Sequence, residues 1–145
     1  MLETSTTMEE LSKEDYKAQA TFRYAIRRFL RLSENNARAA GITPQQYQLL
    51  LAVKSMEDRD WATVSEIAES LQILHHSTVG LCKRAEQLKL IKMARHDLDR
   101  RQVCVYLTKR GEKILASIAK KNRLELERMR EDITQLFLKK PLVRK

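Results

Sequence analysis

The fold of this chain is decided by the stretch TVSEIAESLQILHHSTVGLCKRAEQLKLIKMARHDLDRRQVCVYLT, which runs from Thr63 to Thr108. It opens with a capping box, Thr63-Val64-Ser65-Glu66, in which the hydroxyl and the carboxylate each bond the other residue's backbone amide. This signal predicts a short helix through Leu71. After a break of a few residues, small and apolar residues recur every three or four positions, which predicts a second helix over about 75–89.

The second half of the stretch changes from helical spacing to strict alternation. Residues alternate in character over 91–95 and again over 103–107, which predicts two strands. The connection between them, 96–101, is polar and strongly charged. A short helix, a tight turn, a second helix and a hairpin with a charged tip together form a winged helix-turn-helix, and we place this lobe at 43–108.

The flanking segments predict long helices on both sides of the lobe. Segment 12–40 begins with a capping serine and is followed by Gly41, which is typical of a helix end. Thr43-Pro44-Gln45-Gln46 is a further helix start signal. Thr108 caps a last long helix over 109–138. We therefore predict a mainly α fold with a small β-hairpin wing, as a single domain over 1–145.

The composition narrows the class of protein. The chain is 43% hydrophobic, enough for a core, and its 3 Gly and 2 Pro favour helices over a turn-rich β fold. No apolar run approaches the roughly 20 residues of a membrane-spanning helix, and the first residues lack the pattern of a secretory signal. Two cysteines are too few for a disulfide scaffold. We expect a cytoplasmic protein with no membrane partner.

The charge is positive and unevenly distributed. The formal net charge is +9 and the pI is near 9.8, values at which a nucleic-acid partner becomes a serious hypothesis. Residues 1–82 carry 9 basic and 11 acidic side chains, whereas residues 83–145 carry 19 basic and 8 acidic ones. This asymmetry indicates a basic working face, with an ordinary solubilising surface as the alternative.

The helix over 75–89 has two faces of different chemistry. At about 100° per residue, small and apolar residues gather on one side, as a buried face requires: Thr78, Leu81, Cys82, Ala85 and Leu88. The other side surrounds Gly80, whose missing side chain would let the backbone approach DNA, although helix–helix contact is an alternative. We predict that this side reads double-stranded DNA through His76, Ser77, Gly80, Lys83 and Arg84.

The hairpin tip is the second predicted contact with DNA. Arg100 and Arg101 are candidates to enter the minor groove or to bind its phosphates, and Arg95 to bind a phosphate. Asp99 is an orienting group, because a carboxylate that pairs with one guanidinium fixes the tip and aims the other arginine outward. The alternative is an ordinary solvated turn.

The terminal helices predict a homodimer. Each has an apolar face too extensive for a small winged core to cover, so we expect a second copy to cover it. Asn122 lies in the same row and is a candidate register-setting residue. A dimer would present two recognition helices to a twofold operator, about one turn of DNA apart. The residues predicted to pack there are Phe22, Ile26, Phe29, Leu115, Ile118, Leu126, Met129, Ile133 and Leu136.

The sequence resembles the MarR-type (multiple antibiotic resistance regulator) transcription factors. The resemblance covers roughly 12–138 and is carried by Gly41-Ile42-Thr43-Pro44-Gln45-Gln46-Tyr47, Val64-Ser65-Glu66-Ile67-Ala68-Glu69-Ser70-Leu71, Asp97-Leu98-Asp99-Arg100-Arg101 and Leu107-Thr108-Lys109-Arg110-Gly111-Glu112. It implies a homodimer with interlocked terminal helices that represses genes near a palindromic operator. By position, it adds His75 to the DNA-binding residues of the recognition helix.

The resemblance also implies a small phenolic or aromatic effector that binds in a crevice between the dimer helices and the lobe and releases DNA. Arg23, Tyr24, Tyr47 and Trp61 are the candidates to line that crevice, although each is also a candidate for core or surface.

The chain departs from its family at two turns. Members often carry glycine where this chain has Lys89, and commonly have glycine and a Ser or Asp cap in the turn that holds Gln72 and Leu74. The final helix also reads as one continuous element, whereas many relatives split it.

Other chemistries have weaker support in the sequence. We find no nucleophile with a base, no paired carboxylates in a cleft and no phosphate-binding loop, so we expect no enzyme, no catalytic residue and no cofactor. The histidines and cysteines lack metal-ligand spacing, so we expect no metal. Two alternatives stay open: a redox-responsive regulator that senses oxidants through Cys82 or Cys104, and a winged helix that docks proteins without binding DNA.

Overall fold

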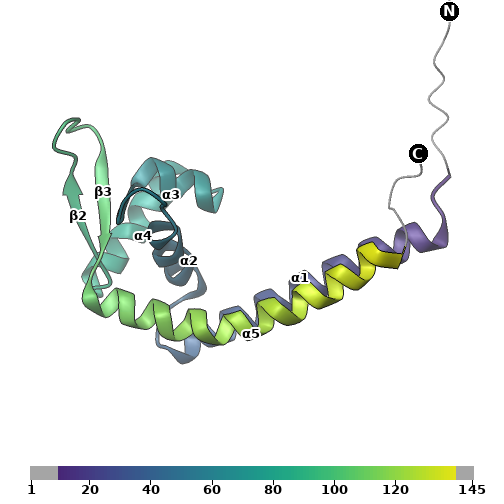
Figure 1. The fold of residues 1–145 in the computed structure, drawn as a ribbon. Coiled ribbons are helices and arrows are strands. Elements are labelled where there is room, and N and C mark those ends of the chain that lie inside the picture. Colours follow the sequence, from purple (N-terminus) through teal and green to yellow (C-terminus); the bar gives the residue numbers. More distant parts are fainter. Residues whose placement is uncertain (1–9, 140–145) are drawn as a thin grey trace, which may run out of the picture.

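The computed structural model describes residues 10–139, which form a lobe attached to a long helical arm (Figure 1). Its elements are, in chain order, α1 (Lys13–Ala39), α2 (Pro44–Lys54), β1 (Trp61–Thr63), α3 (Val64–Leu71), α4 (His75–Gln87), β2 (Ile91–Arg95), β3 (Val103–Leu107) and α5 (Lys109–Lys139). The predicted fold class, mainly helical with a small antiparallel wing and long terminal helices, is confirmed. Among the described residues, no helix combines the length and apolar character that a membrane span requires.

Capping signals in the sequence fix where three helices begin. The structure forms complete capping boxes at Ser12, Thr43 and Thr63, which start α1, α2 and α3. In each box the hydroxyl oxygen accepts from an amide one turn ahead, and the side chain there accepts from the cap's own amide. The helix α4 differs, because its cap is Leu74, which makes no side-chain bond to the helix.

The wing contains one more strand than predicted. The sheet has the order β1-β3-β2, with Trp61 opposite Tyr106 and Thr63 opposite Cys104. The sequence analysis predicted no strand at Trp61, because three residues are too short to show an alternating pattern. The third strand makes β3 central, so both Cys104 and Val105 are buried.

The core of the lobe includes the first turns of α5. Leu49 and Leu50 of α2, Ile67 of α3 and Leu81 of α4 pack in one buried cluster that also contains Leu115 and Ile118 of α5. Leu115 and Ile118 were predicted to face a second copy, but their side chains are covered within one chain. The apolar row of α5 therefore packs into the lobe over the first turns of the helix and extends beyond the lobe over its later turns.

The two long helices are joined by a buried polar contact. The Asn122 side chain of α5 donates to Ser33 Oγ at 2.9 Å and accepts from Asn36 Nδ2 at 2.9 Å. Beyond this point, residues 13–33 of α1 and 122–139 of α5 run side by side away from the lobe (Figure 1), and we call them the arm. Asn122 thus fixes how the two helices align within one chain.

Both turns that flank α4 use a left-handed backbone without glycine. Gln72, just after α3, has φ 55°, and Lys89, just after α4, has φ 61°. At each site the next residue's amide reaches back five residues to a helical carbonyl, from Ile73 to Ala68 and from Leu90 to Ala85. The sequence analysis named these two turns as departures from the resemblance, because neither contains glycine.

The start of α5 is packed directly on the turn that ends α4. Thr108 Oγ1 donates to the carbonyl oxygens of Lys89 and Leu90, at 2.6 and 3.1 Å. Gly111 lies so close that a Cβ atom there would be 2.1 Å from the Leu90 oxygen. Glycine is required at this position by that close approach.

Candidate nucleic-acid interface

The helix α4 is divided into a buried and an exposed face. Thr78, Leu81, Cys82 and Ala85 are buried, and the Thr78 hydroxyl donates to the Leu74 carbonyl at 2.9 Å. Leu88 is 43% exposed although it was predicted to be buried, because the helix already ends at Gln87. The exposed face carries the predicted set: His75, His76, Ser77, Lys83 and Arg84 are exposed, with Gly80 half-buried between them.

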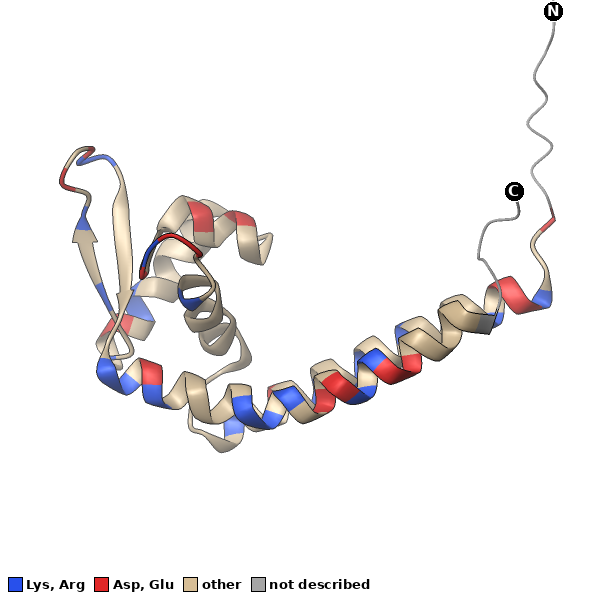
Figure 2. Ribbon diagram, in the orientation of Figure 1, with Lys and Arg blue, Asp and Glu red and all other residues tan. Residues whose placement is uncertain are grey.

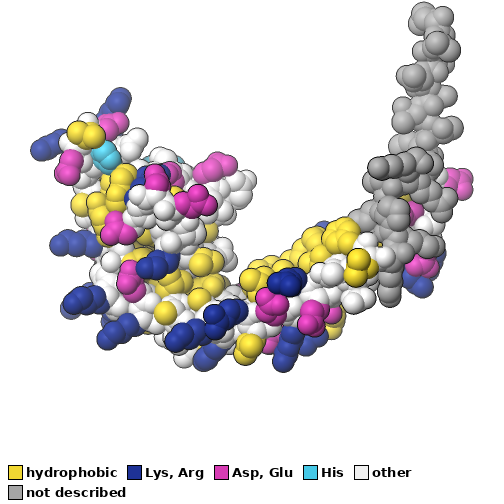
Figure 3. Space-filling view, viewed as in Figure 1, with side chains coloured by type: hydrophobic (Ala, Val, Ile, Leu, Met, Phe, Trp, Pro, Cys, Tyr) yellow, Lys and Arg dark blue, Asp and Glu magenta, His cyan; other side chains and the backbone are white. Residues whose placement is uncertain are grey.

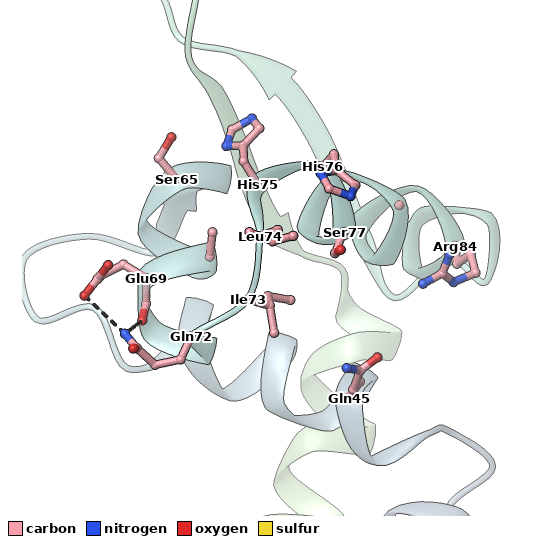
Figure 4. A pocket seen from close by; sticks show the side chains of 12 residues that line it. Gln45, Ser65, Glu69, Gln72, Ile73, Leu74, His75, His76, Ser77 and Arg84 are labelled. Atoms are coloured by element: carbon pink, nitrogen blue, oxygen red, sulfur yellow. Dashed lines mark hydrogen bonds between the residues drawn. The ribbon is translucent and has the colours of Figure 1, made fainter.

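A concave surface lies beside this face and encloses a volume of about 980 Å³. The helices α2, α3 and α4 all contribute to it. Figure 4 shows His75, His76, Ser77 and Arg84 of α4 around it. The sequence analysis missed several of its lining residues, because they come from other elements: Gln45, Ser65, Glu69, Gln72, Ile73 and Leu74. The second residues of α2 and α3, Gln45 and Ser65, gave no signal beyond their place next to a cap.

Gly80 faces open space rather than another helix. A Cβ atom built there would meet only the guanidinium of Arg84, at 3.3 Å, which is the end of a flexible side chain. Among the described residues, no second helix lies close enough to Gly80 to explain the glycine.

The wing tip separates its two arginines. Asp99 accepts from Arg101 Nε at 3.1 Å and from the Arg101 amide at 3.1 Å, and these bonds hold the pKa of Asp99 below its ordinary value. Arg95 donates to the Arg100 carbonyl at 2.8 Å, so it braces the turn. Among residues 10–139, the Arg100 guanidinium has no hydrogen-bond or ion-pair partner. The tip thus has one braced and one free arginine.

Beside the wing lies a stacked group of side chains that the sequence analysis did not single out as a unit. The Trp61 ring has the Arg59 guanidinium 4.4 Å from its centroid, and the His96 ring lies edge-on with centroids 5.3 Å apart. Arg59 in turn donates two bonds to the Glu66 carboxylate of α3, at 2.9 and 2.5 Å. No spacing in the sequence links residues 59, 66 and 96.

Charges of both signs meet on the lobe. Figure 2 shows basic and acidic residues together at the wing tip, and acidic residues on α3. Burial raises the pKa of Glu66, but hydrogen bonds from Thr63 and Arg59 outweigh it and the pKa is lowered overall. Among the described residues, Lys83 and Arg84 of α4 make no ion pair, so their charges are available to a partner.

The residues predicted for an effector crevice do not gather in one place. Tyr24 on α1 is 61% exposed, and Arg23 beside it is also exposed. Tyr47 is buried in the core of the lobe, and Trp61 lies in β1 with its ring against His96. None of the four lines the concave surface beside α4.

The residues predicted for dimer contact fall into three groups. Leu115 and Ile118 are buried in the lobe. Phe22 and Leu126 are 38% and 48% exposed on the arm. The others are partly buried along the arm: Ile26, Phe29, Met129, Ile133 and Leu136.

The cysteines lie apart from this interface. Cys82 and Cys104 are free and buried, and burial is the main cause that raises the pKa of Cys82 to about 11 and also raises that of Cys104. A raised pKa depletes the thiolate that reacts with oxidants. Within residues 10–139, no three His, Cys, Asp or Glu side chains come together as a metal site.

Comparison with known proteins points to one family. The MarR family model matches residues 40–102. The uncharacterized HTH-type transcriptional regulator YfiV of Bacillus subtilis (strain 168) is 33% identical over 88 residues, which are 61% of this chain and 52% of that protein. The chain thus spans about half the length of this curated relative.

Solved structures share the fold at low identity. AbsC of Streptomyces coelicolor, a MarR family transcriptional regulator, superposes with a TM-score of 0.73 at 20% identity, covering 89% of this chain and 90% of AbsC. Sco3205 of the same organism, solved in complex with DNA, gives 0.69 at 18% identity over 85% and 77%. BpsR of Bordetella bronchiseptica, whose DNA binding is regulated by 6-hydroxynicotinic acid, gives 0.63 at 18% identity over 83% and 88%.

Proposed function

We propose that this chain is a winged helix-turn-helix transcriptional regulator of the MarR family, and that it acts as a homodimeric repressor that binds a palindromic operator in double-stranded DNA. Membership in this family agrees with the expectation that the chain is not an enzyme. The observation that carries the proposal is the division of α4, whose apolar side is buried while its polar and cationic side is exposed. A helix with that division presents donors and acceptors to base edges in the major groove.

Different residues on the exposed face of α4 would contact the bases and the phosphates. His75, His76 and Ser77 lie in the first turn, where recognition helices contact base edges. Lys83 and Arg84 further along suit phosphates or guanine, and Gly80 between them lets the backbone come close. Sco3205, which shares the fold, was solved in complex with DNA.

The wing would make the second contact with each half-site. Arg100, whose guanidinium has no partner among the described residues, is the residue we assign to the minor groove. Arg101 is held by Asp99, and Arg95 braces the turn, so their charge contributes to the field at the phosphates while their geometry supports Arg100.

Dimerisation is supported by the apolar side chains that the arm leaves exposed. They include Tyr16, Phe22, Tyr24, Leu30, Leu124, Leu126, Phe137 and Leu138, exposed by 38–73%. Apolar exposure along so long an arm marks a protein interface. A second copy is the occupant we propose, because it also supplies the second recognition helix that a palindrome needs.

We propose that a small aromatic or phenolic compound releases the protein from DNA. BpsR, which shares the fold, is regulated by 6-hydroxynicotinic acid. Figure 3 shows an open angle between the lobe and the arm with hydrophobic side chains on both sides, and we place the effector there.

The proposal is tested by fluorescence anisotropy with the DNA upstream of the protein's own gene and with a shuffled duplex, each at two salt concentrations. We expect tight binding that prefers the upstream duplex and weakens steeply with salt, because phosphate contacts release counterions. Arg84→Ala should weaken binding, whereas Lys17→Ala, which removes an equal charge from the arm, should not. Equal weak binding to both duplexes contradicts a sequence-specific regulator. No binding at low salt favours the protein-docking alternative.

A further inference from the structure

We propose that Trp61 and His96 are positioning residues for the wing, which hold its tip at a fixed place relative to α3 so that Arg100 can meet DNA. The inference rests on the wing contact proposed above. It follows from an unbroken series of contacts that begins on a helix of the helix-turn-helix and ends at the wing tip.

The series is anchored on α3. Glu66 is the third residue of that helix, and its carboxylate accepts from the Thr63 amide at 3.0 Å as part of the capping box. The same carboxylate accepts hydrogen bonds from both terminal nitrogens of Arg59, at 2.9 and 2.5 Å. A two-point pairing of this kind fixes the plane and direction of the guanidinium. The Arg59 side chain is accordingly only 24% exposed.

The Arg59 guanidinium is linked to the wing through the aromatic ring of Trp61. Arg59 lies over the Trp61 ring at 4.4 Å, which is the geometry of a cation–π contact. The edge of the His96 ring meets Trp61 at an interplanar angle of 63°, a favourable arrangement for two aromatic rings. Trp61 also belongs to β1, which pairs with β3. The ring is therefore held on one side by the lobe and on the other contacts the wing.

His96 connects the stack to the backbone of the tip. Its Nδ1 accepts from the amides of Leu98 and Asp99, at 3.1 and 3.2 Å. Its own amide donates to the Gln102 carbonyl at 3.0 Å, which closes the loop. Asp99 then holds Arg101, which leaves Arg100 as the free arginine.

Other support for the tip comes from within the hairpin, where Arg95 donates to the Arg100 carbonyl at 2.8 Å. The tip follows the last residue of β2, and its one apolar side chain, Leu98, is 92% exposed and makes no core contact. The ladder of β2 and β3 sets the shape of the hairpin but ends at the Arg95–Val103 pair. The distance from the tip to the helices that read DNA is thus set by the Glu66–Arg59–Trp61–His96 series, which we call the wing clamp.

The first experiment is a double-mutant cycle on DNA binding. We expect Arg100→Ala to weaken operator binding about tenfold, as one specific contact does, and to lower the salt slope by about one. Trp61→Ala should weaken binding by a similar factor, and the double variant should be no weaker than either single one. Trp61→Phe should recover most of the affinity, because it keeps an aromatic ring. Additive losses, or full affinity in Trp61→Ala beside a weakened Arg100→Ala, would overturn the clamp.

A matched pair of variants at His96 separates its two contacts. His96→Asn keeps a side-chain acceptor for the amides of the tip, as in an Asx turn, but loses the ring that meets Trp61. His96→Phe keeps the ring and loses the acceptor. The clamp needs both contacts, so both variants should lose affinity as Arg100→Ala does. Wild-type affinity in either one contradicts the proposed series.

A second measurement reports the position of the tip without DNA. A spin label at Leu98→Cys lies on a fully accessible side chain, while Cys82 and Cys104 are buried and react slowly. We expect the label to become more mobile in Trp61→Ala than in the parent, at a temperature where circular dichroism shows both to be folded. Unchanged mobility refutes the clamp even if Arg100 makes no contact with DNA. Increased mobility with a silent Arg100→Ala supports the clamp and refutes the wing contact instead.

Discussion

Lys89 ends α4 in a backbone conformation that lysine rarely adopts. Its φ of 61° lies in the left-handed region, where a Cβ atom crowds the following carbonyl at a cost of about 1 kcal/mol. The turn is nevertheless well bonded, since Leu90 and Lys89 donate to the Ala85 and Glu86 carbonyls at 3.0 and 2.9 Å. The fold thus carries a local strain at the junction of α4 and the wing.

Lys89→Gly should therefore stabilise the protein, because glycine adopts this φ without the steric cost. We expect the free energy of unfolding to rise by about 0.5–1 kcal/mol in urea denaturation. Lys89→Ala is the matched control, since it removes the same charge but keeps the Cβ atom, and it should give no gain. Equal effects of the two variants would assign the result to charge instead of strain.

Two glycines in contrasting surroundings make a second prediction at this scale. Gly80→Ala should keep or slightly raise stability, by up to about 1 kcal/mol, because alanine favours a helix and the added Cβ meets only the Arg84 side chain. It should weaken DNA binding at least several-fold if the backbone of α4 lies against DNA. Anisotropy titration and thermal melting on the same preparation separate the two effects.

Gly111→Ala is the structural counterpart. Its Cβ would lie 2.1 Å from the Leu90 carbonyl oxygen, which belongs to the backbone and cannot rotate away. We expect a loss of roughly 1–3 kcal/mol of stability.

For Gly80, by contrast, full DNA affinity in Gly80→Ala would show that the glycine in α4 is merely tolerated.

At the scale of elements, the cap of α3 links stability to acid pH. Hydrogen bonds from Thr63 and Arg59 keep the pKa of Glu66 below its ordinary value of 4.5, despite the opposing effect of burial. A carboxyl with a lowered pKa adds stability above its unfolded pKa, and this stability is lost as pH falls through the folded value. Protonation of Glu66 should therefore weaken the bond to Arg59 below about pH 4.5.

Glu66→Gln tests this link, because glutamine still completes the capping box but carries no charge for Arg59. We expect it to cost about 1 kcal/mol near pH 7, and the difference from the parent to vanish as pH falls below the ordinary glutamate range. Glu69→Gln, on the same helix but bonded only to Gln72, is the control. A pH-independent difference would exclude the charge of Glu66 as the cause.

The elements that the sequence predicted best are those with a local signal. Capping boxes at Thr43 and Thr63 placed two helix starts, and helical spacing divided α4 correctly except at its last turn. The strand β1 was missed because three residues cannot display a period, and its pairing partner β3 lies some forty residues away. The contacts of Trp61 with Arg59 and His96 were missed for the same reason, since they depend on how distant segments meet.

At the scale of the whole molecule, the exposed apolar side chains of the arm predict that two copies of the chain associate through it. Leu126→Glu should raise the dissociation constant of the dimer about tenfold or more, because the interface would have to bury a carboxylate without a partner. Leu126 is 48% exposed in one chain, so the change should leave the monomer folded. Sedimentation velocity across a concentration series measures the shift.

Leu51→Glu is the matched control, because Leu51 is also an exposed leucine, at 43%, but lies on α2 in the lobe. It should leave the sedimentation profile unchanged. A Leu126→Glu protein that stays dimeric at low micromolar concentration would remove residues 122–139 from the interface.

The sequence could not divide the apolar row of α5 between the lobe and the arm. Leu115, Ile118, Leu126 and Met129 follow the same spacing, yet the first two complete the core of the lobe and the others lie beyond Asn122. Periodicity identifies the face of a helix but not the body against which each turn packs. For the same reason, the concave surface beside α4 emerged only from the fold, because it combines side chains from three helices.

The packing of α5 on the turn at Lys89 and Leu90 has a mechanical consequence. The helix is continuous from Lys109 to Lys139, and its first turns are fastened to the carbonyls that end α4. From Ile118 to its end it extends about 30 Å, at 1.5 Å per residue. A tilt of about 10° at the far end would thus displace the lobe by roughly 5 Å relative to that end, more than the 3.4 Å step between base pairs. The arm thus acts as a lever that pivots beside α4. In the proposed dimer on DNA, a small change where the two arms meet would therefore shift α4 along the groove.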